Sequence, residues 1–201
     1  MVVQQKRKYE LKKRAELQEE TRCRIVEATV DLHREVGPAN TTISAVAERA
    51  GVQRLTVYRH FPDERGLIRA CSAHWRSQHP APDPSQWPGI ADPVERLRTA
   101  LQGFYAYYGG DERMAANVRR DAPTVPALAE VISDLPAFMA MVVEILAPGW
   151  GARGARRARL VAALGHVLDF DTWRSLERRQ GLAPAAAVEV ALAMVRGVAG
   201  R

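Results

Sequence analysis

A short stretch of the sequence gathers side chains that suit the edges of nucleic-acid bases. Residues 54–60 read RLTVYRH. A helix that enters the major groove of DNA needs hydrogen-bond donors and acceptors on its outer face. Val52, Val57 and Phe61 can pack inward, which leaves most of the polar groups pointing outward. The outward set is Arg54, Thr56, Tyr58, Arg59 and His60. The pattern predicts DNA binding.

The segment before this stretch has the spacing of a short helix that would position it. Its apolar residues recur three or four apart, as one helix face requires, and they are Ile43, Val46, Ala47 and Ala50. Gly51 follows and can adopt the left-handed turn conformation that most residues avoid. Residues 42–61 therefore predict a helix-turn-helix. The alternative is an ordinary helical hairpin with a solvated polar face, which the coincidence of these features disfavours.

Residues 22–70 resemble the DNA-binding domain of the tetracycline-repressor (TetR) family. The matching stretches are RCRIVEATVDLHREVGPANTTISAVAERAGV and QRLTVYRHFPDERGLIRA. The resemblance implies that base edges or methyl groups are contacted by Arg54, Leu55, Thr56 and Tyr58. It also implies that Thr42, Tyr58 and His60 lie near phosphates. One departure is Glu64, where the family often has lysine, although the neighbouring Arg65 can substitute.

Composition agrees with a basic globular protein. The chain has 201 residues, 47% hydrophobic and 26% charged, with a formal net charge of +6, which favours polyanions. No apolar run approaches the ~20 residues of a membrane span, and we expect no membrane partner. Cys23 and Cys71 suggest no disulfide framework, so we expect a reducing cytoplasm.

The whole chain is readable as helices, so we predict an all-α fold. It comprises a basic N-terminal arm (residues 1–20), a three-helix DNA-binding domain with the helix-turn-helix (21–68) and a helical ligand-sensing and dimerisation domain (69–201). The arm carries Lys6, Arg7, Lys8, Lys12, Lys13 and Arg14. It can reach phosphates or a minor groove, or be a solvated charge run. The first helix proper places Ile25, Ala28, Leu32 and Val36 on one face and stops at Gly37-Pro38.

Beyond a proline-rich loop at residues 77–93, apolar spacing predicts helices near 92–108, 111–121, 124–147, 152–179 and 184–198. Pro136 should kink or split the third. The last is almost all Ala, Val, Leu and Met, so it must be covered on most faces. A second copy of the chain can cover it, as resemblance to the TetR family implies. The alternative is burial within the monomer.

The family resemblance also implies a core pocket for a small-molecule effector whose identity the sequence does not give. Aromatic and methionine side chains suit an adaptable apolar pocket. The candidates are Phe104, Tyr105, Tyr108, Met114, Phe138, Met139, Met141, His166 and Trp173. The alternative, which is favoured for any single one of them, is an ordinary place in the hydrophobic core. His166, Asp169 and Trp173 share a helix face and can add polar contacts.

The sequence contains no enzymatic or cofactor-binding motif in the structural setting that such a motif requires. Residues 149–154 (GWGARG) match a dinucleotide-binding pattern, but they follow a helix rather than a strand. The histidines form no HExxH pattern and the cysteines lack metal-ligand spacing. We therefore predict no enzyme, cofactor or metal. The sequence predicts a ligand-responsive repressor that binds a palindromic operator as a homodimer. The alternatives are an activator, or a helical small-molecule-binding protein without sequence-specific DNA binding.

Overall fold

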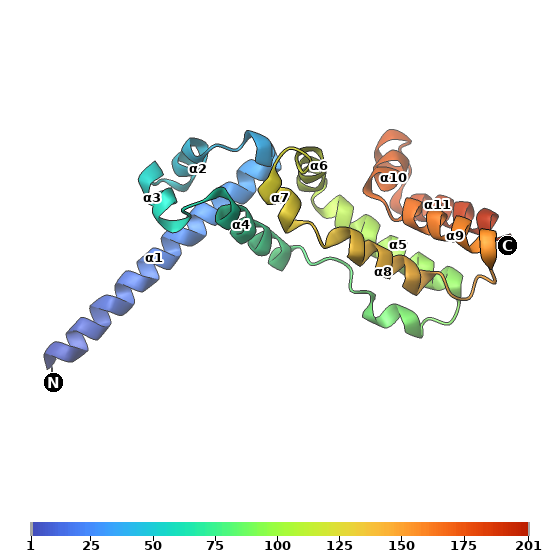
Figure 1. The fold of residues 1–201 in the computed structure, drawn as a ribbon, viewed down its shortest axis with the longest axis horizontal. Coiled ribbons are helices and arrows are strands. Elements are labelled where there is room, and N and C mark those ends of the chain that lie inside the picture. The colour runs from blue at the N-terminus through green and yellow to red at the C-terminus, as the bar shows by residue number, and fades with distance from the viewer. Residues whose placement is uncertain (1, 201) are drawn as a thin grey trace. The chain divides into compact units, whose positions relative to one another are not determined.

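The computed structural model describes the backbone of residues 2–200 and the side chains of residues 9–200. Every regular element within this range is helical, which confirms the all-α prediction. In chain order (Figure 1) the elements are α1 (Val2–Glu35), η1 (Pro38–Asn40), α2 (Ile43–Ala50), α3 (Arg54–His60), α4 (Glu64–Gln78), η2 (Pro84–Gly89), α5 (Pro93–Gly110), α6 (Glu112–Asp121), α7 (Pro126–Val131), α8 (Leu135–Leu146), α9 (Gly154–Val167), α10 (Phe170–Arg174), η3 (Ser175–Arg179) and α11 (Pro184–Ala199). None of these described helices is long and apolar enough to cross a bilayer.

The chain divides into two compact units. Unit 1 comprises Met1–Gln78 and Arg113–Ile132, and unit 2 comprises His79–Glu112 and Ser133–Arg201. Unit 1 therefore takes α6 and α7 from the middle of the chain. The functional boundaries at residues 20/21 and 68/69 follow sequence motifs rather than contacts, and they stay predictions.

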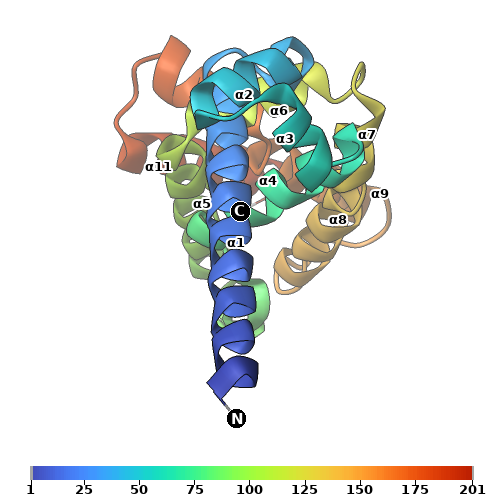
Figure 2. The same ribbon diagram turned by 90° about the vertical axis from the view of Figure 1, so that its left-hand side faces the viewer.

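Unit 1 is organised around the long helix α1. The C-terminal half of α1 packs against α2 and α4, while its N-terminal half projects beyond α2 and α3 in both ribbon views (Figures 1 and 2). Ile25, Ala28 and Leu32 are buried in the core of this unit, as the spacing predicted. Val36 was predicted on the same face but is 42% exposed, because α1 ends one residue earlier.

Helix α6 satisfies the backbone at the C-terminal end of α1. The side-chain amide of Asn117 donates to the carbonyls of His33 and Arg34, each at 2.9 Å. The buried carboxylate of Asp121 accepts from the N–H of Ala39 at 3.0 Å and from Arg120 Nε at 2.6 Å. The last carbonyls of a helix have no partner within the helix, so α6 acts as a cap built from a distant part of the sequence.

A buried imidazole lies beside this cap. His33 is 6% exposed, and its Nδ1 lies 3.5 Å from Sγ of the buried Cys71. Burial lowers the pKa of His33 to about 4, against a smaller opposing effect of the Asp121 carboxylate. Burial also raises the pKa of the Cys71 thiol to about 12. Both groups are therefore neutral near pH 7.

Unit 2 is a helical bundle in which α5 packs against α10 and α11, and α9 packs against α8 and α11. An aromatic cluster fills its interior. Tyr108 lies 5.5 Å from Phe170 and 5.8 Å from Trp173 between ring centroids, and Phe104 lies 5.9 Å from Tyr108. Rings at these separations and tilted angles attract one another beyond their area burial.

Two long helical segments predicted in the second half of the chain are interrupted. The segment 124–147 is split as Pro136 suggested, into α7 and α8, with Pro136 in the first turn of α8. The single helix predicted over residues 152–179 is wrong. It breaks after Leu168, where the Asp169 side chain accepts from the Asp171 N–H at 2.7 Å and caps α10. An aspartate competes for backbone groups in this way and favours a new helix start.

Candidate nucleic-acid interface

The turn between α2 and α3 has the geometry that the glycine predicts. Gly51 adopts φ 65° and ψ 39°, and the Val52 N–H donates to the Ala47 carbonyl at 2.9 Å, which closes the end of α2. At the other end, Thr42 Oγ1 accepts from the Ala45 N–H at 3.1 Å. Thr42 therefore fixes the start of α2, while its exposed position leaves it open to solvent.

The inner face of α3 is anchored within unit 1. Val57 is fully buried and Phe61 nearly so. The guanidinium of Arg22 stacks over the Phe61 ring at 5.1 Å, and Arg24 donates to the Ala50 carbonyl at 3.3 Å. Helix α1 thus contacts the turn and the C-terminal end of the helix-turn-helix, and this support helps to fix which side of α3 faces outward.

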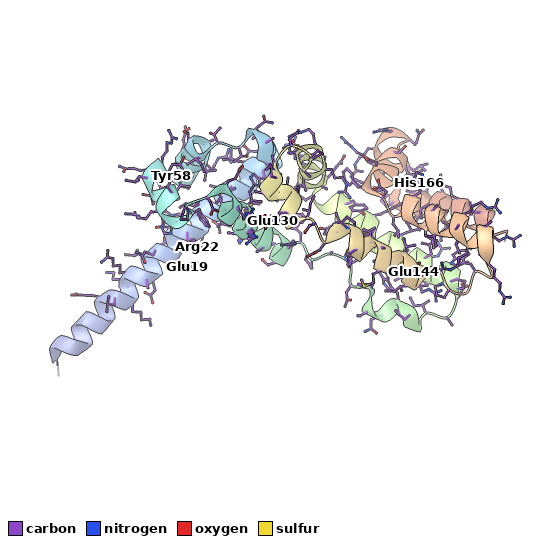
Figure 3. The ribbon with its side chains drawn as sticks, viewed as in Figure 1. Glu19, Arg22, Tyr58, Glu130, Glu144 and His166 are labelled. Carbon is purple, nitrogen blue, oxygen red and sulfur yellow. The ribbon has the colours of Figure 1, made fainter. Side chains whose placement is uncertain are left out.

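The outer face of α3 carries the exposed members of the predicted site. Arg54, Leu55, Tyr58 and Arg59 are exposed, whereas Thr56 and His60 are half-buried. Tyr58, which is labelled in Figure 3, lies on α3 of unit 1. Six of the seven predicted DNA contacts thus lie on one short helix, with Thr42 at the start of α2. Their contacts with DNA stay a prediction.

Gln53 is a residue that sequence reasoning missed. It is exposed at the N-terminal boundary of α3, and its side chain makes no capping hydrogen bond there. A free carboxamide can bind adenine through two hydrogen bonds. Its position directly before Arg54 is the feature of the sequence that could have indicated it as a candidate for DNA contact.

The arginine proposed to replace the family's lysine has a protein partner. Arg65 Nε lies 3.0 Å from Glu130 Oε2, and Arg69 forms a second ion pair with the same carboxylate. Glu130 belongs to α7 and is labelled in Figure 3. A phosphate would have to compete with this carboxylate for Arg65.

The basic arm continues α1 as a helix from Val2. The side chains of Lys6, Arg7 and Lys8 lie outside the described ones. Further along, Lys12 pairs with Glu16 at 3.8 Å on a well-exposed surface. The choice between DNA contact and a solvated run stays open at these residues.

The predicted pocket residues in unit 2 divide between core and surface. Phe104, Tyr105, Tyr108 and Trp173 are buried, and the two tyrosine hydroxyls donate to the carbonyls of Val167 and Leu168 at 3.0 and 2.8 Å. Phe138 is half-buried, whereas Met141 and His166 are exposed. Met114 belongs to the core of unit 1 instead. These positions do not show whether an effector binds here, so the assignment of the pocket residues stays a prediction.

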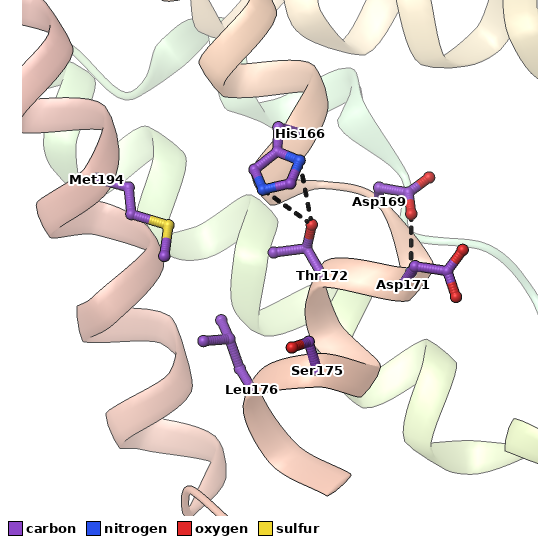
Figure 4. A pocket seen from close by; sticks show the side chains of 7 residues that line it. All are labelled: His166, Asp169, Asp171, Thr172, Ser175, Leu176 and Met194. Carbon is purple, nitrogen blue, oxygen red and sulfur yellow. Dashed lines mark hydrogen bonds between the residues drawn. The ribbon is translucent and has the colours of Figure 1, made fainter. Parts of the chain in front are cut away.

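A cavity of about 320 Å³ in unit 2 includes His166 in its lining (Figure 4). The other lining residues are Asp169, Asp171, Thr172, Ser175, Leu176 and Met194. The Thr172 hydroxyl lies 3.5 Å from both ring nitrogens of His166. His166 and Asp169 therefore do lie together, while Trp173 is directed into the aromatic cluster.

A helix-turn-helix with a basic outer face, in a chain whose described regular elements are all helical, is typical of DNA-binding regulators. Residues 25–71 match the family described as "Bacterial regulatory proteins, tetR family". The helix-turn-helix part of the chain is therefore similar to the DNA-binding domain of this family, which supports a DNA-binding transcriptional regulator.

Solved structures agree in fold. A TetR-like transcriptional regulator from Rhodococcus sp. RHA1 is 23% identical, with a TM-score of 0.60 over 90% of this chain and 97% of that one. FadR from Bacillus subtilis, solved in complex with stearoyl-CoA, is 17% identical, with a TM-score of 0.60 over 86% and 96%. NalD from Pseudomonas aeruginosa, the secondary repressor of a multidrug efflux pump, is 24% identical, with a TM-score of 0.57 over 90% and 96%. None of the curated protein sequences compared with the chain matches it significantly.

Proposed function

We propose that the chain is a ligand-responsive repressor that binds a palindromic operator as a homodimer. The observation that carries the proposal is the outer face of α3, where Arg54, Tyr58 and Arg59 are exposed while Val57 is buried behind them. Guanidinium groups bind guanine edges and phosphates, and a phenol can do either. The α3 helix is therefore the part of the chain that we assign to the major groove.

The surface of α9 and α11 supports a homodimer. The buried side of α11 packs within unit 2, but its other side exposes Ala186, Ala193 and Gly197. Helix α9 packs against α11 and exposes Ala158 and Ala162. Small side chains let helix backbones approach closely, and a two-fold interface uses the same surface on both copies. We assign this face to the second protomer, which would bring a second α3 to the other half of the operator.

The assignment of ligand response rests on relatives and on the interior of unit 2. FadR was solved with stearoyl-CoA bound, and NalD is a repressor. Unit 2 of this chain has an aromatic interior, and the indole Nε1 of the buried Trp173 has no hydrogen-bond partner. Such a group is costly to bury, and an effector that supplies an acceptor would remove that cost. Stearoyl-CoA is a suitable first probe of effector release from the operator.

Selection of bound sequences from random DNA by the purified full chain tests the central proposal. We expect a palindrome whose half-site centres lie about one helical turn (~34–36 Å) apart. Arg54→Ala should weaken binding to it by ~1–3 kcal/mol if the guanidinium reads a base. Recovery of unrelated fragments by a folded protein would overturn the proposal. Transcription from a promoter that overlaps the selected site should fall when protein is added, and a rise would show an activator instead.

The dimer assignment has its own test. Ala193→Glu places a charge on the exposed side of α11 and should shift the chain to monomer in analytical ultracentrifugation. Ala140→Glu is the matched control, because Ala140 is also an exposed alanine within a helix of unit 2 but belongs to α8. Equal behaviour of the two variants, with the wild-type chain dimeric, would remove α11 from the interface.

A further inference from the structure

The junction between α8 and α9 gathers positive charge that the proposed function leaves unused. Four arginines lie within seven positions at the start of α9, and all four are exposed: Arg153, Arg156, Arg157 and Arg159. Glu144 pairs with Arg157 at 2.6 Å. The other three arginines form no ion pair among the described side chains. This surplus of positive charge favours an anionic ligand.

These charges lie at the end of a helix that suits them least. The N-terminus of a helix carries a partial positive charge, and its first N–H groups have no partners within the helix. The first turn of α9 contains no acidic residue, and Arg153 at its N-cap makes no capping hydrogen bond. The N–H groups of Gly154 and Ala155 have no acceptor among the described residues. An anion bound here would accept from these N–H groups and offset the repulsion.

A glycine-rich loop leads into this helix and leaves its N-terminus open. Gly151 and Gly154 have φ values of 70° and 52°, in the left-handed region that favours glycine. A Cβ atom added to either glycine would meet nothing within 4 Å. Residues 149–154 (GWGARG) therefore keep the phosphate-holding part of a dinucleotide-binding motif, which is glycine before a helix N-terminus. The strand that this motif also needs is replaced here by α8.

A buried guanidinium contacts the start of the same loop. Arg96 of α5 is 5% exposed, and it donates to the carbonyl of Ile90 at 2.8 Å and to the carbonyl of Pro148. Its Nε has no hydrogen-bond partner, and no carboxylate pairs with it among the described side chains. A buried charge without a counter-charge is costly. An anion at the adjoining loop would lower this cost, so Arg96 points to the same ligand charge independently of α9.

We propose that the α8–α9 loop and the first turn of α9 form a binding site for a phosphate group. The guanidinium groups of Arg153 and Arg156 and the N–H groups of Gly154 and Ala155 hold it. The two arginines occupy the N-cap and N3 positions, which lie on the same side of a helix start. Phosphate oxygens accept from guanidinium groups and from backbone N–H groups together. The phosphate belongs either to the free inorganic ion or to a phosphorylated small molecule.

Isothermal titration calorimetry of the full-length protein at constant ionic strength tests the proposal, with inorganic phosphate and coenzyme A as probes. Equal affinities indicate a site for the free ion, whereas tighter binding of coenzyme A indicates a larger phosphorylated ligand. Arg153→Gln and Arg156→Gln should each weaken binding about tenfold (~1.4 kcal/mol), because each removes a charge-assisted hydrogen bond. Arg179→Gln is the matched control, because Arg179 is an exposed arginine of unit 2 that belongs to η3. It should keep the wild-type affinity.

A proline substitution separates a defined site from a general positive surface. Ala155→Pro removes one N–H group and keeps every charge, and proline is tolerated in the first turn of a helix. Phosphate affinity should fall about fivefold (~1 kcal/mol) in this variant. Circular dichroism checks that the variant is folded. Unchanged affinity in the folded variant would overturn the site, because the arginines would then act only as a charged surface.

The inference is also overturned if neither probe binds, or if Arg153→Gln and Arg156→Gln bind both probes as wild type does. DNA is the other polyanion that these arginines could contact. In phosphate-free buffer both variants should therefore keep the operator affinity of wild type, and a loss would assign the arginines to the DNA backbone instead. Each of these failures leaves the proposed function intact, whereas the absence of any selected operator refutes the proposed function and not the phosphate site.

Discussion

The two units use aromatic side chains in opposite ways. In unit 1, Tyr58 lies on the outside of α3 and is 44% exposed, with the apolar core behind it. In unit 2, Tyr108, Phe170 and Trp173 are packed into the interior, and the Tyr108 hydroxyl is already bound to a backbone carbonyl. The same residue types thus lie on an exposed surface in one unit and in the core of the other.

The difference shows that residue type alone does not decide whether an aromatic side chain can contact DNA, because its exposure decides this as well. A group can read DNA only if its hydrogen-bonding atoms are free, and the outer face of α3 meets this condition. Among the described side chains in the interior of unit 2, two buried nitrogens have no hydrogen-bond partner, the indole Nε1 of Trp173 and the Nε of Arg96. Substitutions in the two units should therefore separate binding from stability.

The largest expected effect comes from a matched pair of aromatic truncations. Trp173→Ala should lower the free energy of unfolding by about 3–5 kcal/mol, because it leaves a cavity in a packed core. Tyr58→Ala should change it by less than about 0.5 kcal/mol, because the ring is exposed. Urea denaturation measures both. Operator affinity should show the reverse order, with Tyr58→Ala the weaker binder by ~1–3 kcal/mol. Similar stability losses in the two variants would contradict the contrast between the units.

A smaller effect is the pH dependence that His33 gives to unit 1. The folded-state pKa of about 4 lies below the unfolded value near 6.5, so the unfolded chain binds more protons between these values. Stability should thus be full above pH 6.5 and fall as the pH drops toward 4, by about 3 kcal/mol in all. His33→Leu should flatten urea-denaturation stability over this window. An unchanged slope in that variant would assign the dependence to other groups, such as Asp121, whose pKa is lowered by its hydrogen bond from Arg120.

The smallest effect concerns the acidic partner of Arg65. Glu130→Gln should release Arg65 and Arg69 for phosphates, so non-specific DNA affinity should rise and the salt slope should steepen by about one for each new contact. Stability should change by no more than about 1 kcal/mol, since the pairs are exposed. Fluorescence anisotropy across a salt series measures the slope. Glu144→Gln is the control, because Glu144 pairs with Arg157 in unit 2. Equal slopes in all three proteins would show that Arg65 does not reach DNA.

The sequence was most informative where short-range rules decide the structure. Apolar spacing, a glycine turn and an N-terminal cap define α2 and the turn before α3 from neighbouring residues, and both were predicted. The all-α fold and the split near Pro136 followed from the same kind of rule.

The remaining features depend on contacts between residues far apart in sequence. Asn117 caps the end of α1 more than eighty positions away, and Glu130 pairs with Arg65 from a different helix. Met114 was grouped with the aromatic residues of unit 2 by its type, yet it packs in unit 1. Residue type and spacing carry no information on which distant helix returns to which core.

Helix α6 and the segment after it have a consequence for modular exchange between regulators. The chain passes from one unit to the other after residues 78, 112 and 132, so the DNA-binding unit is not a contiguous piece of the gene. A fragment cut after residue 78 would leave the carbonyls of His33 and Arg34 without their amide donor. Chimeras that transfer unit 1 to another protein therefore need residues 113–132 as well as the N-terminal segment, and a crossover within residues 113–132 would divide unit 1 between the two parent proteins.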